Sequence, residues 1–96
     1  MTPEEIAAKI IPILKSYGAQ RASVFGSAAR GDAKTESDVD ILIDIKKDIS
    51  LLEFIKMKQL LEKKLGRKVD LVEYQTLKPA LKDKILSEQV SILWKK

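Results

Sequence analysis

Residues 26–40 read GSAARGDAKTESDVD. A run typical of a β-strand precedes this stretch at residues 20–25, and a second begins inside it and continues to residue 45. Asp38 and Asp40 stand two residues apart where the second run begins. Because strand side chains alternate between faces, we expect both carboxylates to project side by side, away from the intervening valine. The sequence therefore predicts two neighbouring like charges at the start of a strand.

These two carboxylates indicate a cation site. Two like charges held close together repel, and the usual outcomes are a raised pKa or a bound cation. Mg²⁺ binds carboxylate oxygens together with the phosphate oxygens of a substrate. Gly26 and Ser27 lie just upstream at a turn, where a phosphate can approach the backbone. The combination favours nucleotide chemistry.

The composition describes a small globular domain. The chain has 96 residues, of which 45% are hydrophobic and 33% charged, and we expect a single domain over residues 1–96. It contains no cysteine, so disulfides and thiolate metal sites are excluded. It contains no histidine, which removes the commonest general base and zinc ligand.

The charge is unevenly distributed. Residues 1–45 carry five basic and seven acidic side chains, a net charge of −2, and residues 46–96 carry thirteen and seven, a net charge of +6. The basic half suits an acidic partner or nucleic acid, although a solvated, lysine-rich helix surface is the simpler explanation. No apolar run approaches the length of a membrane span, and no signal-peptide pattern is present. We expect a cytoplasmic protein.

Apolar periodicity and capping residues predict strands that alternate with helices. The expected helices cover residues 3–17, 51–65 and 79–86, with a short helical turn at 27–30, and the expected strands cover 20–25, 38–45, 68–74 and 90–94. This order favours an α/β (α+β) fold with a small mixed sheet of about four strands covered by helices.

The motifs resemble those of a known family. Gly26-Ser27, residues 29–31 and residues 37–40 are similar to the GSxARG…SDxD signature of the DNA-polymerase-β-like nucleotidyltransferases. The chain resembles the smallest members of that superfamily, the minimal nucleotidyltransferase (MNT) domains. The resemblance covers about residues 20–94. It implies a third acid on the following strand, and Asp70 lies at that place.

The resemblance implies specific roles. Asp38 and Asp40 would bind two Mg²⁺ ions, which would in turn fix the triphosphate of ATP, and Asp70 would bind the ion that activates the incoming hydroxyl. Ser27 would hold the β- and γ-phosphates, and Gly26 would let them approach the backbone.

Three neighbouring residues have less defined roles. Arg30 contacts either the triphosphate or a nearby carboxylate, and Ser37 is expected to be a turn or cap residue beside the metal site; both are counted with Gly26 and Ser27 as nucleotide-binding residues. Asp44 shares the parity of Asp38 but lies about 20 Å along the strand, too far to bind the same ions.

MNT domains are commonly paired with HEPN-domain ribonuclease toxins, and such members transfer AMP onto a tyrosine of the toxin. The resemblance therefore implies an ATP-dependent protein adenylyltransferase that acts as an antitoxin. Two alternatives stay open: an antitoxin that works by binding alone, and nucleotidyl transfer to a small molecule or an RNA end. A nucleic-acid-binding module is disfavoured, because aromatic and basic residues are not interleaved. The nucleotide base and the oligomeric state are left undetermined.

Overall fold

The structure is a computed structural model that describes residues 2–26, 29, 38–45 and 49–94, apart from the side chains of Leu81 and Trp94. Its elements are α1 (Pro3–Ser16), β1 (Ala19–Phe25), β2 (Val39–Ile45), α3 (Leu51–Leu65), β3 (Val69–Glu73), the 3-10 turn η1 (Tyr74–Thr76), α4 (Pro79–Glu88) and β4 (Val90–Trp94). The predicted α/β fold with a small mixed sheet is confirmed.

The four strands form one sheet in the order β3-β2-β1-β4. β1 is antiparallel to both of its neighbours, β2 and β4. β2 and β3 are parallel, and α3 makes the crossover between them. This parallel pair matters for the site, because both strands begin at the same end of the sheet.

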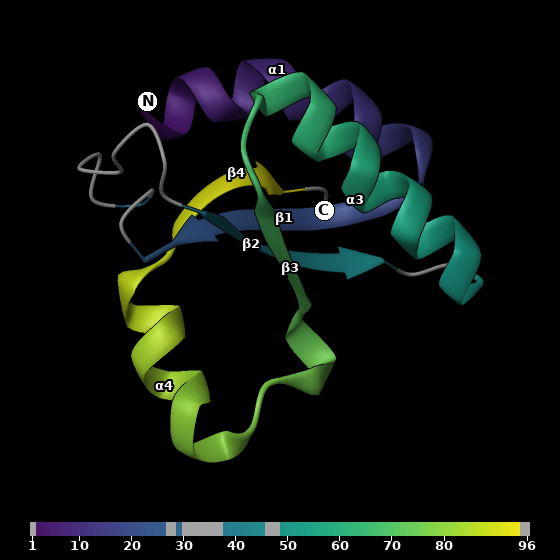
Figure 1. Cartoon of the computed structure of the whole chain (residues 1–96). Helices are drawn as coiled ribbons and strands as arrows, with labels where there is room; N and C mark the ends of the chain where they lie inside the picture. Colours follow the sequence, from purple (N-terminus) through teal and green to yellow (C-terminus); the bar gives the residue numbers. More distant parts are fainter. Residues whose placement is uncertain (1, 27–28, 30–37, 46–48, 95–96) are drawn as a thin grey trace.

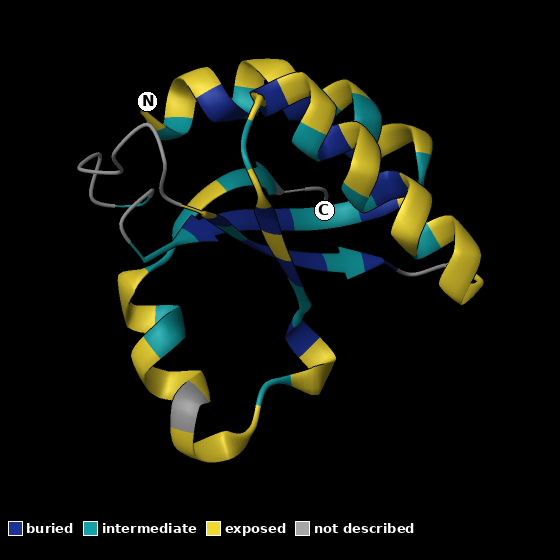
Figure 2. Cartoon of the chain, in the orientation of Figure 1, coloured by how far each residue is buried: buried dark blue, intermediate teal, exposed yellow. Residues whose placement is uncertain are grey.

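The helices divide between the two faces of the sheet. α1 and α3 lie side by side over one face, and α4 lies beyond the other (Figure 1). The main core fills the space under α1 and α3 (Figure 2). The fully buried side chains of that core are Ile6, Ile10, Leu14, Ala22, Val24, Val39, Ile41, Ile43, Met57 and Leu61. No described helix is long and apolar enough to cross a membrane.

Side-chain caps fix where the two long helices begin. The hydroxyl of Thr2 accepts a hydrogen bond from the backbone N–H of Glu5 at 3.1 Å, and Ser50 accepts one from Glu53 at 3.1 Å. Each cap satisfies an N–H group that has no partner within its helix. α3 ends at Gly66, whose φ of 69° is the left-handed conformation that glycine adopts most readily. The capping residues in the sequence predicted these boundaries.

Some element boundaries differ from the sequence-based prediction. β3 ends at Glu73, and Tyr74 begins a 3-10 turn because its buried side chain is held by hydrogen bonds described below. α4 runs to Glu88, about half a turn beyond its predicted end, and Ser87 donates a hydrogen bond to a backbone carbonyl in this extension. The predicted helical turn at 27–30, apart from Ala29, lies outside the described residues.

Candidate active site

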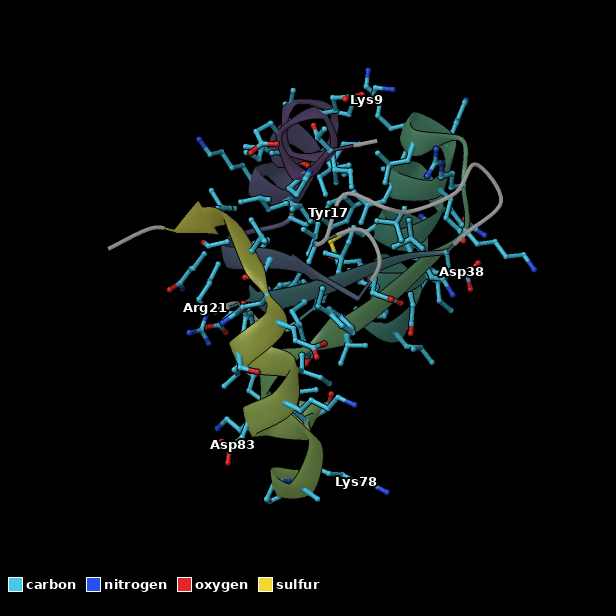
Figure 3. All side chains as sticks on the ribbon, turned by 90° about the vertical axis from the view of Figure 1, so that its left-hand side faces the viewer. Lys9, Tyr17, Arg21, Asp38, Lys78 and Asp83 are labelled. Atoms are coloured by element: carbon cyan, nitrogen blue, oxygen red, sulfur yellow. The ribbon has the colours of Figure 1, made fainter. Side chains whose placement is uncertain are left out.

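Asp40 and Asp70 stand opposite each other on the two parallel strands. Their Cα atoms are register partners in the pairing of β2 with β3. Paired residues of adjacent strands point to the same face, and adjacent strands lie about 4.8 Å apart. Asp38 precedes β2 and comes two residues before Asp40. In Figure 3 it lies on the opposite side of the molecule from Arg21.

The alternation of side chains puts these acids on the face that α1 and α3 leave uncovered. Val39 and Ile41 of β2, together with Val69 and Leu71 of β3, point into the core under those helices. The intervening residues, Asp40 and its partner on β3, therefore face the other way. Val39 therefore points away from Asp40, as the alternation in the sequence predicts.

The surroundings of Asp40 disfavour its charged form. Burial raises the pKa of its carboxyl, and the negative charges of Asp70 and then of Asp38 raise it further. Asp38 and Asp70 themselves are exposed to solvent. An unsatisfied negative charge of this kind is stabilised by a cation, and oxygen ligands from carboxylates suit Mg²⁺.

The acids share a face without forming a closed metal site. Within the described part of the chain, no group of three acidic side chains is close enough to hold a metal ion as it stands. Like charges repel, so drawing the carboxylates onto one point needs a positive charge between them. The described residues therefore present a negatively charged face centred on Asp40, with Asp70 as its register partner and Asp38 two residues upstream.

Gly26 contributes to this site in a way that the sequence did not reveal. It follows β1 with a φ of 66°, and a Cβ atom built on it would lie 2.5 Å from Oδ2 of Asp40. Real Cβ atoms essentially never come that close to another heavy atom. The glycine thus serves the turn and leaves room for the Asp40 carboxylate. Its predicted role beside a phosphate stays a prediction.

Other predicted site residues lie outside the described part of the chain. Ser27, Arg30 and Ser37 belong to this group, so their expected roles at the triphosphate or beside the metal stay predictions. The backbone N–H of Ala29 donates to the carbonyl of Gly26 at 3.2 Å, which is a helical type of hydrogen bond directly after β1.

At the other end of the sheet, Asp44 pairs with Arg21. Their side chains approach to 3.8 Å between Nη2 and Oδ2, and the two residues are register partners in β1 and β2. The guanidinium of Arg21 also lies over the ring of Tyr74, 3.8 Å from its centroid. These contacts account for Asp44 as a structural residue, in agreement with its predicted exclusion from the metal site.

A buried chain of hydroxyl groups was missed from the sequence. Ser23, 1% exposed, lies 2.6 Å from the hydroxyl of Tyr74, which donates to Oε1 of Gln89 at 2.6 Å. The hydroxyl of Tyr74 has one hydrogen, which it donates to Gln89, so the hydroxyl of Ser23 must donate to Tyr74. The chain links β1, η1 and the end of α4. In β1, Ser23 points to the same face as Arg21, whereas Ala22 and Val24 point into the core. This alternation is the sequence feature from which the role of Ser23 could have been predicted.

Two curated relatives resemble the chain over most of its length. A Methanocaldococcus jannaschii protein named "putative protein adenylyltransferase" is 47% identical over 93 residues, which cover 97% of this chain and 100% of that protein. The protein adenylyltransferase MntA of Thermococcus cleftensis is 45% identical over 76 residues, covering 79% of this chain and 77% of that protein.

Solved toxin–antitoxin structures share the fold. One, determined with AMP-PNP, has a TM-score of 0.80 at 24% identity and covers 94% of this chain and 73% of that chain. Another is a tri-AMPylated Shewanella oneidensis HEPN toxin in complex with its MNT antitoxin, with a TM-score of 0.74 at 21% identity, covering 98% of this chain and 73% of that chain. At these identities the likeness concerns the fold.

The sequence also matches a family pattern over nearly its whole length. Residues 8–96 match the family described as "Polymerase beta, Nucleotidyltransferase". The match includes both strands that carry the aspartates and the turn at Gly26. The chain therefore belongs to the polymerase beta nucleotidyltransferase family.

Proposed function

We propose that the chain is a Mg²⁺-dependent protein adenylyltransferase that transfers AMP from ATP to a tyrosine of a partner HEPN-domain toxin and so acts as its antitoxin. The observation that carries this proposal is the register of Asp40 with Asp70 on parallel strands, with Asp38 two residues upstream. The names of the Methanocaldococcus and Thermococcus relatives support the protein acceptor. One chain of a solved HEPN toxin–MNT antitoxin complex has the same fold as this chain, which supports a HEPN-domain partner.

The proposed reaction is an in-line displacement at the α-phosphorus of ATP. The acceptor oxygen forms a bond to that phosphorus, the bond to the β-phosphate oxygen breaks, and pyrophosphate leaves with the electron pair. The hydroxyl proton passes to a base or to water. Two Mg²⁺ ions, when bound, would stabilise the attacking and leaving oxygens.

The positions of the three acids suggest a division of labour. Asp40 lies on the inner strand β2 and is half-buried, and with Asp38 it would bind the ions that carry the triphosphate. Asp70 lies exposed on the edge strand β3, where an acceptor has access to it. Asp70 would therefore bind the ion that activates the acceptor hydroxyl and would take the proton of that hydroxyl. The Gly26–Ser27 turn would hold the outer phosphates.

Incubation with ATP labelled at the α-phosphate tests this proposal directly. The chain, Mg²⁺ and the protein encoded next to it are combined, and label on that neighbour is followed by gel and mass spectrometry. We expect an added AMP on a tyrosine, lost in Asp70→Asn. Asp44→Asn, which removes a charge from the sheet away from the site, is the matched control and should keep the activity.

Two other outcomes would replace the proposal. Inhibition of the neighbour without label would show an antitoxin that works by binding alone. Transfer of label to RNA ends or to a small hydroxylated compound, with the neighbour unmodified, would move the acceptor to a different class.

A further inference from the structure

The outer edge of β3 carries backbone groups that have no hydrogen-bond partner among the described residues. β3 is the first strand in the sheet order, so only one of its edges meets β2. The N–H of Val39 donates to the carbonyl of Lys68 at 2.9 Å, which fixes the phase of the parallel ladder. In such a ladder alternate residues turn their backbone groups to the neighbour. Asp70 therefore bonds to β2, and Leu71 and Glu73 point their N–H groups outward.

Both ends of this edge are capped by side chains. The outward N–H of Val69 donates to Oε2 of Glu62 at 3.0 Å. At the other end, the hydroxyl of Thr76 donates to the carbonyl of Glu73 at 2.9 Å. Between the caps remain four outward groups: the carbonyl of Val69, both groups of Leu71 and the N–H of Glu73. None of these four has a hydrogen-bond partner among the described residues.

An apolar groove runs beside this uncapped section. Its volume is about 420 Å³, and it lies between the start of α3, the end of β3 and η1. Leu51 and Phe54 of α3 line it together with Leu71 and Glu73 of β3. Leu51 is 75% exposed. A hydrogen-bonding strand edge with an apolar pocket alongside is the arrangement that binds an extended peptide as an additional strand.

The uncapped section also adjoins the candidate active site. Leu71 follows Asp70 directly, and the two side chains point to opposite faces of the sheet. A residue that pairs with Leu71 would place its side chain on the groove side. The next residue of an antiparallel partner would lie opposite Asp70, with its side chain on the acid face, about 5 Å away across the strands.

We infer that the edge of β3 binds the acceptor protein as an added antiparallel strand, in which an apolar residue pairs with Leu71 and the hydroxyl-bearing residue that follows it faces Asp70. This inference rests on the proposed function for the identity of the reaction. It adds the surface that recognises the acceptor and the sequence pattern that the surface selects: alternating apolar residues with the modified residue between two of them.

A second copy of the chain fits this edge less well. Pairing two β3 strands about Leu71 would place both copies of Asp70 on the same face, each with its neighbouring acids. In that pairing each Asp70 stands opposite Val72 of the other copy and diagonal to the other Asp70, so the second copy adds negative charge to a face that already carries Asp40. An acceptor strand with an uncharged hydroxyl residue at that position brings no such repulsion.

A peptide pair tests binding without any requirement for catalysis. The probe is the blocked peptide Lys-Val-Ala-Val-Tyr-Val-Lys, and its control carries an N-methyl group on the second valine, which removes the N–H aimed at the Leu71 carbonyl. We expect the probe to shift the NMR signals of the Leu71 and Glu73 amides and to slow their hydrogen exchange. The control peptide should bind about tenfold more weakly. Unchanged amides at Leu71 and Glu73 would overturn the inference.

Two variants of Glu73 test the role of the edge in transfer. Glu73→Pro removes the outward N–H and suits the φ of −85° at this residue, and Glu73→Ala keeps the N–H while removing the same carboxylate. With wild-type activity on the acceptor established, we expect kcat/KM for the acceptor to be about tenfold lower in Glu73→Pro than in Glu73→Ala. The KM for ATP should be equal in both. Equal acceptor kinetics in the two variants would refute edge pairing and leave the proposed function standing.

Two exposed leucines provide a second matched pair. Leu51 lines the groove, whereas Leu52, 61% exposed on the same helix turn, does not. We expect Leu51→Ala to raise the KM for the acceptor and Leu52→Ala to leave it unchanged.

The remaining outcomes separate the two proposals. If the wild-type chain modifies no acceptor, the proposed function fails, and the NMR experiment still decides whether the edge binds a strand. A concentration-dependent dimer in sedimentation that Glu73→Pro abolishes would assign the edge to a second copy and overturn the inference.

Discussion

Asp40 combines burial with two like-charged neighbours. It is half-buried on an inner strand, and its register partner Asp70 and the preceding Asp38 are both acidic. Burial and these charges raise its pKa, so the folded protein pays a cost for ionising it. A charge that lowers stability at neutral pH is typical of a functional position, because sites are where such costs are tolerated.

Asp40→Asn should therefore stabilise the fold while abolishing transfer. Because the pKa is raised in the folded state, wild type loses stability as pH rises from the ordinary aspartate value through the raised one. The variant lacks this loss. In chelator-treated protein we expect its Tm to exceed that of wild type by a few degrees at pH 7, and the difference to shrink as the pH falls. Thermal melts across pH measure this.

Asp44→Asn is the control for that experiment, because Asp44 pairs with Arg21. It should gain no stability at neutral pH. A Tm for Asp40→Asn at or below that of wild type throughout the pH range would contradict the assigned cost.

Gly26→Ala should lower both stability and activity, because the new Cβ would meet the Asp40 carboxylate. Gly66 offers a matched control: its φ is 69°, against 66° for Gly26, and a Cβ there would meet nothing within 4 Å. Left-handed backbone costs a non-glycine residue about 1–2 kcal/mol, so both variants should lose at least this much free energy of unfolding. Only Gly26→Ala should also lose most of its kcat. Equal kcat in the two variants would contradict a role for the Gly26–Asp40 contact.

The neighbouring positions of Asp38 and Asp40 could be predicted from the sequence because strand alternation is a local property. The steric need for glycine at position 26 could not, because the atom that a Cβ would meet belongs to Asp40, fourteen positions away on the next strand. Contacts of this kind need the register of β1 with β2, which no local pattern supplies.

Among the elements, α4 depends on a few polar contacts. Its residues are mostly exposed (Figure 2), and Gln89 directly after it accepts the hydrogen bond from Tyr74. Tyr74 in turn holds Ser23 of β1. This hydroxyl chain ties η1 and the end of α4 to the open face of the sheet.

Tyr74→Phe should destabilise the protein by about 1–3 kcal/mol, because it leaves the buried Ser23 hydroxyl without its acceptor. The double variant with Ser23→Ala should lose less free energy than the sum of the two single variants, since no buried hydroxyl is then left unpaired. Urea unfolding of the four proteins measures this coupling. Strictly additive losses would show that the hydroxyl chain contributes nothing.

The elements themselves were largely predictable. α3 and β4 have the predicted bounds, because a capping serine, a terminal glycine and a β-branched apolar run define them locally. The predicted strand 68–74 was one residue too long at each end; at its C-terminal end Tyr74 begins a 3-10 turn, where its hydroxyl hydrogen-bonds with Ser23 of β1 and Gln89 after α4. The pairing of strands into the order β3-β2-β1-β4 requires the whole chain.

At the scale of the whole molecule, metal removal should affect activity and not the stability of the fold. A chelator should abolish transfer and leave the fold intact, because the core under α1 and α3 contains no metal-dependent contact. Mg²⁺ with a non-hydrolysable ATP analogue at 100 times its Kd should stabilise the chain by about 2.7 kcal/mol. Thermal shift assays measure both effects. Full transfer in excess chelator would contradict the metal requirement.

Besides the acid face, the edge of β3 and the mostly exposed α4 are surfaces that a partner protein could contact. Both lie beside or beyond the acid face (Figure 1). Which residues of a partner reach Asp70 depends on that partner's own sequence.

The central claim is that Asp38, Asp40 and Asp70 together bind divalent ions and a triphosphate. A crystal soaked with Mn²⁺ and a non-hydrolysable ATP analogue would test it through anomalous scattering. We predict Mn²⁺ peaks within bonding distance of Asp38 and Asp40, with Asp70 bound to one of the ions and the triphosphate beside Gly26. Mn²⁺ bound elsewhere, or an Asp70 carboxylate that contacts no ion while the nucleotide is in place, would contradict the account.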